Sequence, residues 1–330
     1  MTFPSEIFRD FTVLSIPMKA RFRGIDYREV AIFRGDEGWS EFSPFLEYGT
    51  AEASTWLKAS LAAAYKPWPT LVRESIPINA TLPTVSIDRV PEILGRFPGC
   101  TTVKIKVDDF EVGSELVEAT LDYLPEAKIR LDVNGGWTLE EALLHLYDYN
   151  LRFGNIFDYI EQPCQSLDDL KKLKREVPFK IAVDEGIRKN LDTAMELLDQ
   201  YADVAILKWA PVGGIDAAHE LASRIGLPVV ISSALETGIG ISQSLALAAS
   251  FPHLDYACGL GTVSLLESDI CEPAFTPVNG QMQVRRAEPV PALLSKYQAA
   301  PERVEWWQQR VTEIWMSEAF ASVKEGSGWR

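Results

Sequence analysis

Lysine and carboxylate side chains recur at regular intervals along this chain, in positions from which they could move protons. Lys104 and Lys106 stand two apart in the apolar, β-branched run 102–107. Residues two apart on a β-strand share a face, so both ammonium groups should face one polar space. Further apolar runs end in polar residues at Asp132 and Asn134, Glu161, Asp184, Lys208, and Ser232 with Ser233.

The spacing of these polar residues indicates which elements carry them. Successive charged ends lie 23 to 29 residues apart, about the length of a strand, a loop and a helix. Charged residues at the carboxyl ends of parallel strands, one for each βα unit, are how a TIM barrel builds an active site. We therefore predict an α/β fold with a TIM-type (β/α) barrel. Its strands are expected at 76–81, 102–107, 129–133, 157–161, 180–184, 204–208, 228–233 and 254–260. Its helices are expected at 111–123, 139–149, 167–176, 191–199, 214–223 and 240–250.

Residues before the barrel predict a separate α+β capping domain. Alternating runs at 11–16, 27–33 and 38–42 are separated by glycine turns and predict an antiparallel meander. A helix should follow at 51–66, with Thr50 as its N-cap.

The expected boundaries are 1–75 for the capping domain, 76–270 for the barrel and 271–330 for a C-terminal segment that packs back on both. In that segment a helix is expected from 302 to about 323. Its tryptophans, Trp306, Trp307 and Trp315, should pack against the first domain or the barrel.

Composition excludes several classes of function. The net charge of −15 over 330 residues argues against nucleic acid or an anionic membrane as partner, and favours a small-molecule substrate. The four cysteines form no CxxC pair, so neither disulfides nor structural zinc are expected. The N-terminus lacks the features of a signal peptide, and no apolar run reaches about 18 residues, so we expect a cytoplasmic protein. A monomer or a small homo-oligomer fits equally well.

Three carboxylates at the ends of consecutive strands predict a metal site. Asp132, Glu161 and Asp184 should converge at the barrel mouth, where three like charges repel each other unless a cation lies between them. Oxygen ligands without cysteine or histidine select Mg²⁺, for which Mn²⁺ may substitute. Asn134 should lie beside the metal.

The two lysines from opposite sides of the barrel predict acid–base chemistry. Lys106 and Lys208 belong to the second and sixth strands, and the three histidines stand elsewhere, so proton transfer falls to the lysines and carboxylates. A lysine base near pH 7 needs a lowered pKa, and a positive charge about 4 Å away supplies roughly three units. Lys104 and the metal are expected to provide that charge. Ser232 and Ser233 suit an anionic group of the substrate or cap the following helix.

The chain resembles the muconate-lactonizing subgroup of the enolase superfamily over almost its whole length. The likeness lies in the order of its motifs, which are Lys-x-Lys, Asp-x-Asn, Glu-Gln-Pro, Asp-Glu and Lys. Within that subgroup it is similar to the o-succinylbenzoate synthases of actinobacterial type. The segments that carry this likeness are 130–137, 159–164 and 232–240, and 21–24 is similar to that branch's mobile loop over the site. One departure is Asp184-Glu-Gly186, where racemases of the subgroup often have Asp-Glu-Ser.

The resemblance implies an enolase-like, modified barrel and a Mg²⁺-dependent lyase of menaquinone biosynthesis. Its reaction would be the syn dehydration of 2-succinyl-6-hydroxy-2,4-cyclohexadiene-1-carboxylate to 2-succinylbenzoate through an ene-diolate. Lys106 would remove the α-proton and protonate the leaving hydroxyl, while Lys208 stays cationic on the other face. Glu185 would support the metal site. Substrate-binding residues would be Ser232, Ser233, Thr237, Gly238 and Arg21.

Other functions remain open at this stage. An N-succinylamino acid racemase or a dipeptide epimerase would use the same lysines and metal, and a muconate-type cycloisomerase is a third reading. A Schiff-base lyase would use Lys208 as nucleophile. A barrel that only binds a ligand would not need the complete set of lysines and carboxylates.

Overall fold

The structure is a computed structural model that describes residues 2–184, 186–187, 195–318 and 320–321. A three-stranded antiparallel sheet opens the chain, in the order β1-β2-β3, as the alternating runs predict. Its elements are β1 (Arg9–Phe22), β2 (Ile25–Arg34), β3 (Trp39–Phe42) and the helix α1 (Thr50–Tyr65). Gly49, rather than Thr50, is the N-cap of α1.

A parallel sheet of seven strands forms the second part, in the order β11-β10-β9-β8-β7-β6-β5. Its strands are β5 (Ala80–Leu82), β6 (Thr102–Lys106), β7 (Lys128–Asp132), β8 (Phe157–Glu161), β9 (Ile181–Val183), β10 (Val204–Leu207) and β11 (Val229–Ile231). The helices on this part of the chain are α2 (Val90–Leu94), α3 (Phe110–Tyr123), α4 (Leu139–Phe153), α5 (Leu167–Glu176), α7 (Ile215–Ile225) and α8 (Gly238–Ser250). Short 3₁₀ turns occur at Ile87–Arg89, Met195–Gln200 and Gly261–Leu265. The predicted alternation of strand and helix is thereby confirmed.

The first and eighth predicted strands differ from expectation. The run 76–81 is divided between β4 (Ser75–Pro77), which pairs antiparallel with β12 (Gln281–Gln283), and β5, which pairs with β6. Pro77 has no N–H to donate to a continuous ladder. The segment 254–260 forms single parallel bridges, from Cys258 to Ile78 and from Gly259 to Ser232. These two bridges join the two edges of the seven-stranded sheet and close the barrel.

A buried arginine inside the barrel forms hydrogen bonds to both segments that meet where the barrel closes. Arg130 on β7 is fully buried and stacks on Tyr159, with the guanidinium carbon 4.6 Å from the ring centroid. Its Nε donates to Asp158 at 2.8 Å, and its Nη1 donates to Asn79 Oδ1 and to the carbonyl of Ala257. The side chain therefore links β7 and β8 to both segments that meet at the seam.

Local capping explains where several helices begin. Thr138 and Glu141 form a reciprocal capping box at the start of α4. Asp109 and Ser166 accept N–H bonds at the starts of α3 and α5. Part of the helix predicted at 191–199 falls outside the described residues.

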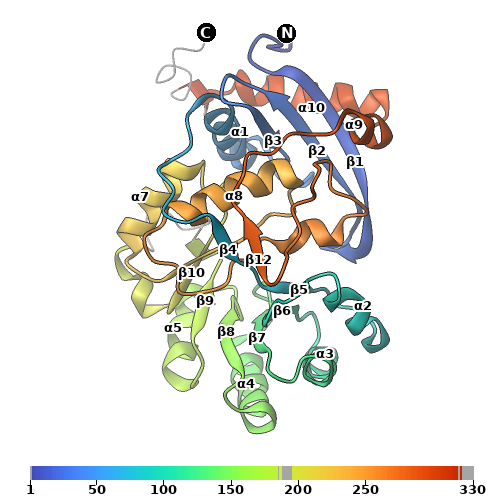
Figure 1. Cartoon of the computed structure of the whole chain (residues 1–330). Helices are drawn as coiled ribbons and strands as arrows, with labels where there is room; N and C mark the ends of the chain where they lie inside the picture. The colour runs from blue at the N-terminus through green and yellow to red at the C-terminus, as the bar shows by residue number, and fades with distance from the viewer. Residues whose placement is uncertain (1, 185, 188–194, 319, 322–330) are drawn as a thin grey trace.

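The C-terminal helices cover the capping sheet, as Figure 1 shows in red beside the blue strands. They are α9 (Pro291–Tyr297) and α10 (Pro301–Trp315), so the described helix ends earlier than predicted. Trp307 meets Phe42 and Trp315 meets Phe8, with ring centroids 5.8 and 5.9 Å apart. The prediction that these two tryptophans pack on the first domain is confirmed.

All four cysteines are buried and unpaired, as expected. Burial raises the pKa of Cys100 to about 12 and those of Cys164 and Cys258 to about 11, and it also raises the pKa of Cys271. In the described part of the chain, no helix is both long and apolar enough to cross a lipid bilayer.

Candidate active site

The polar ends of β6, β7 and β8 lie side by side because these strands pair in parallel register. Lys106 opposes Asp132, and Asp132 opposes Glu161. Apolar side chains on the other face of each strand, such as Ile105 and Leu131, are fully buried and fix this orientation. The parallel pairing of these strands therefore brings the charged residues at their ends into one cluster.

Lysines and carboxylates in this cluster form close ion pairs. Lys104 Nζ lies 2.9 Å from Asp132 Oδ2 and 3.1 Å from both carboxylate oxygens of Glu161. Lys106 Nζ lies 2.6 Å from Asp132 Oδ2 and donates to Asn134 Oδ1 at 2.7 Å. Burial lowers the pKa of Lys104, but the charges of Asp132 and Glu161 outweigh it and raise that pKa well above its ordinary value. The neighbouring carboxylates therefore favour the charged form of Lys104.

A small inner cavity of about 40 Å³ brings the two predicted catalytic lysines together. Lys106 and Lys208 both line it, from β6 and from the end of β10. Lys208 also forms an ion pair with Asp184 at the end of β9. The other residues that line the cavity are Phe22, Arg23, Phe45, Thr81, Lys104, Asp132, Asn134, Ser232, Ser233, Ala234, Leu235, Gly259 and Thr262.

An outer cavity of about 430 Å³ adjoins the inner one and shares Phe22, Arg23, Lys106 and Asn134 with it. Arg21 lines only the outer cavity, where its guanidinium donates to the carbonyl of Gly24. The tip of the β1–β2 hairpin therefore covers the approach to Lys106.

The five predicted substrate-binding residues do not all line the cavities. Ser232 and Ser233 line the inner cavity, and Ser233 Oγ lies 2.6 Å from Thr262 Oγ1. Thr237 and Gly238 line neither cavity, because protein carboxylates take their N–H groups. Thr237 donates to Glu41, and Gly238 N donates to Asp269 at 2.8 Å. These contacts do not support the prediction that Thr237 and Gly238 bind the substrate.

The carboxylate cluster has the chemistry of a site for a divalent cation. Asp132 Oδ1 is buried and has no hydrogen-bond partner among the described residues. Burial, and to a smaller extent the charge of Asp132, raise the pKa of Glu161 to about 7. Within residues 2–184, 186–187, 195–318 and 320–321, no three acidic, histidine or cysteine side chains are grouped as ligands, and ammonium groups contact the carboxylates instead. The donor set of Asp132, Glu161 and Asp184 is nevertheless all oxygen, which is the chemistry that Mg²⁺ prefers.

Several cavity residues were not predicted from the sequence. Phe22 and Arg23 belong to segment 21–24, which the resemblance placed over the site, although neither was named as a site residue. Phe45 is also in the capping domain, and only the fold shows that it faces the cavity. Arg21 and Arg23 are two apart in one hairpin, so the sequence could not tell which of them reaches the inner cavity. Glu185, predicted to support the metal site, lies outside the described residues.

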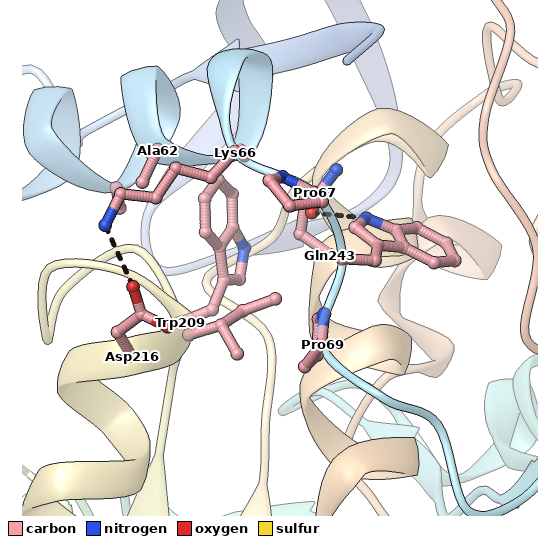
Figure 2. Close-up of a pocket in the computed structure, with 11 residues that line it drawn as sticks. Ala62, Lys66, Pro67, Pro69, Trp209, Asp216 and Gln243 are labelled. Carbon is pink, nitrogen blue, oxygen red and sulfur yellow. Dashed lines mark hydrogen bonds and ion pairs between the residues drawn. The ribbon is translucent and has the colours of Figure 1, made fainter.

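A third cavity, of about 80 Å³, is lined by Trp209, which follows Lys208 in the chain. Figure 2 shows Lys66, Pro67 and Pro69, which follow α1, facing Trp209 and Gln243 of the barrel. Lys66 is ion-paired with Asp216 at 2.9 Å, and alanine and proline side chains make up much of the remaining wall. Lys208 and Trp209 therefore face different cavities, and the acid–base groups gather in the inner one.

Comparison with protein families agrees with this architecture. Residues 13–64 match the family described as enolase N-terminal domain-like, and residues 95–289 match the family described as enolase C-terminal domain-like.

Proteins named o-succinylbenzoate synthase are similar to this chain over most of its length. The protein of that name from Mycobacterium tuberculosis (strain ATCC 25618 / H37Rv) is 45% identical over 305 residues, 91% of each chain. The one from Mycolicibacterium smegmatis is 42% identical over 312 residues, covering 93% of this chain and 95% of the relative.

Solved structures share the fold at lower identity. The muconate lactonizing enzyme from Pseudomonas fluorescens, complexed with muconolactone, is 20% identical with a TM-score of 0.73, covering 88% of this chain and 98% of the other. The L-Ala-D/L-Glu epimerase from Bacillus subtilis is 19% identical with a TM-score of 0.71, covering 85% and 96%. The predicted fold, an enolase-like barrel with a capping domain, is confirmed.

Proposed function

This chain belongs to the enolase superfamily and, within it, to the o-succinylbenzoate synthase family, and from that premise we propose that it dehydrates 2-succinyl-6-hydroxy-2,4-cyclohexadiene-1-carboxylate to 2-succinylbenzoate. The product is an intermediate of menaquinone biosynthesis. The racemase and epimerase alternatives are not favoured, because the relatives at 42–45% identity carry the synthase name.

One observation supports this proposal above the others. Lys106 and Lys208 reach a single enclosed cavity from opposite strands, and Asp132 lines the same cavity. A flat six-membered ring between the two ammonium groups would present one face to each. A base on one face and a cation on the other are what a syn elimination through a planar anion requires.

We assign the proton to Lys106. Its neutral amine takes the proton α to the carboxylate, and the electron pair enters the carboxylate to give the substrate's ene-diolate. The resulting ammonium group then protonates the hydroxyl on the same face, the carbon–oxygen bond breaks and water leaves. The ring gains a third double bond and becomes aromatic, which drives the reaction forward.

Lys208 and the carboxylates have supporting tasks in this scheme. Lys208 remains an ammonium group held by Asp184 and stabilises the planar anion electrostatically. Asp132, Glu161 and Asp184 would hold Mg²⁺, with Mn²⁺ as a substitute. When bound, the ion supplies positive charge beside the substrate carboxylate. Ser232, Ser233 and Arg23 border the space left for the succinyl arm.

The decisive assay follows loss of the cyclohexadiene substrate by the purified protein, with Mg²⁺ and then with excess EDTA. We expect turnover with kcat on the order of 10 s⁻¹, the usual range for enzymes, and its loss with EDTA. Negligible turnover of this substrate, with N-succinylamino acids racemised instead, would move the function to the racemase branch.

The remaining proposals concern the setting of the enzyme. We propose a cytoplasmic location, a monomer or small homo-oligomer, and the domain division 1–75, 76–270 and 271–330. Two contacts support a C-terminal segment that packs back on the other parts. In that segment, β12 pairs with β4, and α9 contacts β1 of the capping domain.

A further inference from the structure

The loop that forms one wall of the inner cavity has an unusual backbone. Residues 232–235 line the cavity, and we call the segment through Thr237 loop 232–237. Leu235 has a φ of 66° in the left-handed region, which is unfavourable for a bulky side chain. A residue stays in such a conformation only where its surroundings impose it. Two charged residues of the capping domain, Arg28 and Glu41, make up much of those surroundings.

Arg28 on β2 binds the carbonyl groups of this loop. It is 2% exposed, and its Nε donates to Leu235 O at 2.9 Å. Its Nη2 donates to Ala234 O at 3.3 Å and to Ser43 O of its own domain. The planar guanidinium thereby holds two consecutive carbonyl groups of the loop in one orientation.

Glu41 on β3 binds the end of the loop and the helix that follows. One carboxylate oxygen accepts Thr237 Oγ1 at 2.6 Å, Thr237 N at 3.1 Å and Gly240 N at 3.2 Å. The other oxygen accepts Ser43 Oγ at 2.6 Å. The two capping-domain side chains therefore hold the loop from Ala234 to the first turn of α8.

Neither Arg28 nor Glu41 lines the inner cavity, so neither would contact a substrate there. A buried charge costs desolvation that an apolar side chain of similar size would avoid. Both side chains form their hydrogen bonds with the loop of the neighbouring domain and with Ser43, rather than with solvent.

We infer that Arg28 and Glu41 are positioning residues, which fix loop 232–237 in the conformation that the substrate requires. The inference rests on the proposed function and deepens it. The capping domain would thereby shape the rear wall of the site through these two residues, in addition to covering the entrance.

The test replaces Arg28 by methionine, which keeps the length of the side chain and removes its donors. Because misplacement of the substrate by about 1 Å costs roughly 100-fold in rate, we expect Arg28→Met to lower kcat/KM by about that factor, with a raised KM. Deuterium uptake of the amides in 233–240 should rise in the same variant. Arg28→Lys, which keeps one donor group, should recover part of both losses.

Two matched variants serve as controls. Arg303 on α10 also binds β2, through Glu29 at 2.7 Å, without touching the loop. Arg303→Met should therefore leave kcat/KM within about threefold of the original. Glu41→Gln can keep the acceptor for Thr237 and Gly240, whereas Glu41→Leu cannot. We expect Glu41→Leu to resemble Arg28→Met and Glu41→Gln to remain active.

The outcomes separate this inference from the proposed function. A folded Arg28→Met protein with kcat/KM and deuterium uptake like those of Arg303→Met would overturn the inference. If Arg28→Met does not fold, unchanged kcat/KM in both Arg28→Lys and Glu41→Leu would overturn it. If the original protein does not turn over the substrate while Arg28→Met still loosens 233–240, the proposed function fails and the role of Arg28 in holding the loop stands.

Discussion

At the scale of single residues, each lysine in the cluster has a different set of partners. Lys104 is enclosed by Asp132 and Glu161. Lys106 shares Asp132 but also contacts Asn134 and borders both the inner and outer cavities. These contacts distinguish a lysine enclosed by carboxylates from one that borders the space open to a substrate.

Replacing Lys106 by alanine should abolish turnover while the carboxylates remain. We expect kcat to fall by a factor of at least about 100, because positioned acid–base catalysis usually contributes 10² to 10⁴. Mg²⁺ binding, measured by calorimetry without substrate, should persist. Lys128 is a matched control, because it is exposed and begins β7, at the opposite end of the strand from Asp132. Lys128→Ala should retain activity, and a Lys106→Ala enzyme with more than about a hundredth of the original kcat would remove Lys106 from the role of base.

Residues that end strands were predictable because the pattern is local. An apolar run that stops at Asp132 or Lys208 identifies both the strand and its chemical end. Arg28 and Glu41 escaped notice although each is a charged residue within an alternating apolar run. Their partners lie about 200 residues away in the chain, and no local pattern records such a contact.

At the scale of elements, the start of α8 depends on a carboxylate at the end of the barrel. Asp269 is buried and accepts N–H bonds from Gly238 at 2.8 Å, Ile270 at 2.7 Å and Phe275 at 2.9 Å. A Cβ on Gly238 would come within 2.5 Å of Asp269 and of Phe275, so glycine is required for this approach. One carboxylate therefore fixes the helix against the 270–275 segment.

Asp269→Ala should destabilise the protein strongly without touching the lysines. Three buried N–H groups would lose their acceptor, and each costs about 1 to 3 kcal/mol. The free energy of unfolding in urea should therefore fall by at least about 3 kcal/mol. Asp269→Asn keeps one acceptor oxygen and should lose less. A loss below about 1 kcal/mol for alanine would show that water replaces the carboxylate.

Element boundaries also show the limit of local patterns. Strands 102–107 and 157–161 were predicted within a residue, since each is a short β-branched or aromatic run with a clear end. The run 254–260 looked equally apolar but, among the described residues, makes only two single bridges, to segments far away in the chain.

At the scale of the whole molecule, the capping domain and the barrel share buried charges. Glu41 lies close to Arg28 of its own domain and to Glu236 of the barrel. Burial and the charge of Glu236 raise the pKa of Glu41 to about 7, and the charge of Arg28 lowers this pKa by a smaller amount. The contact between the domains therefore contains a carboxyl group that titrates near neutrality.

This carboxyl group makes stability depend on pH in a definite direction. Between about pH 4.5 and 7 the folded protein keeps a proton on Glu41 that the unfolded chain releases. Glu41 therefore lowers the free energy of unfolding as pH rises through this window, by up to roughly 3 kcal/mol above it. Urea unfolding at pH 5 and pH 7.5 should show a smaller decrease for Glu41→Gln than for the original protein. Equal decreases in both proteins would contradict the raised pKa.

The inaccessible thiols have a practical consequence for following the hairpin over the site. Thiol-reactive dyes are attacked by thiolates, and the four native cysteines are buried with raised pKa values. Asp26, exposed on the same hairpin as Arg23, offers a place for one added cysteine. A fluorophore attached there would be the single label on an otherwise unaltered chain. Its emission would report, in real time, how the hairpin responds when a substrate enters or a product leaves.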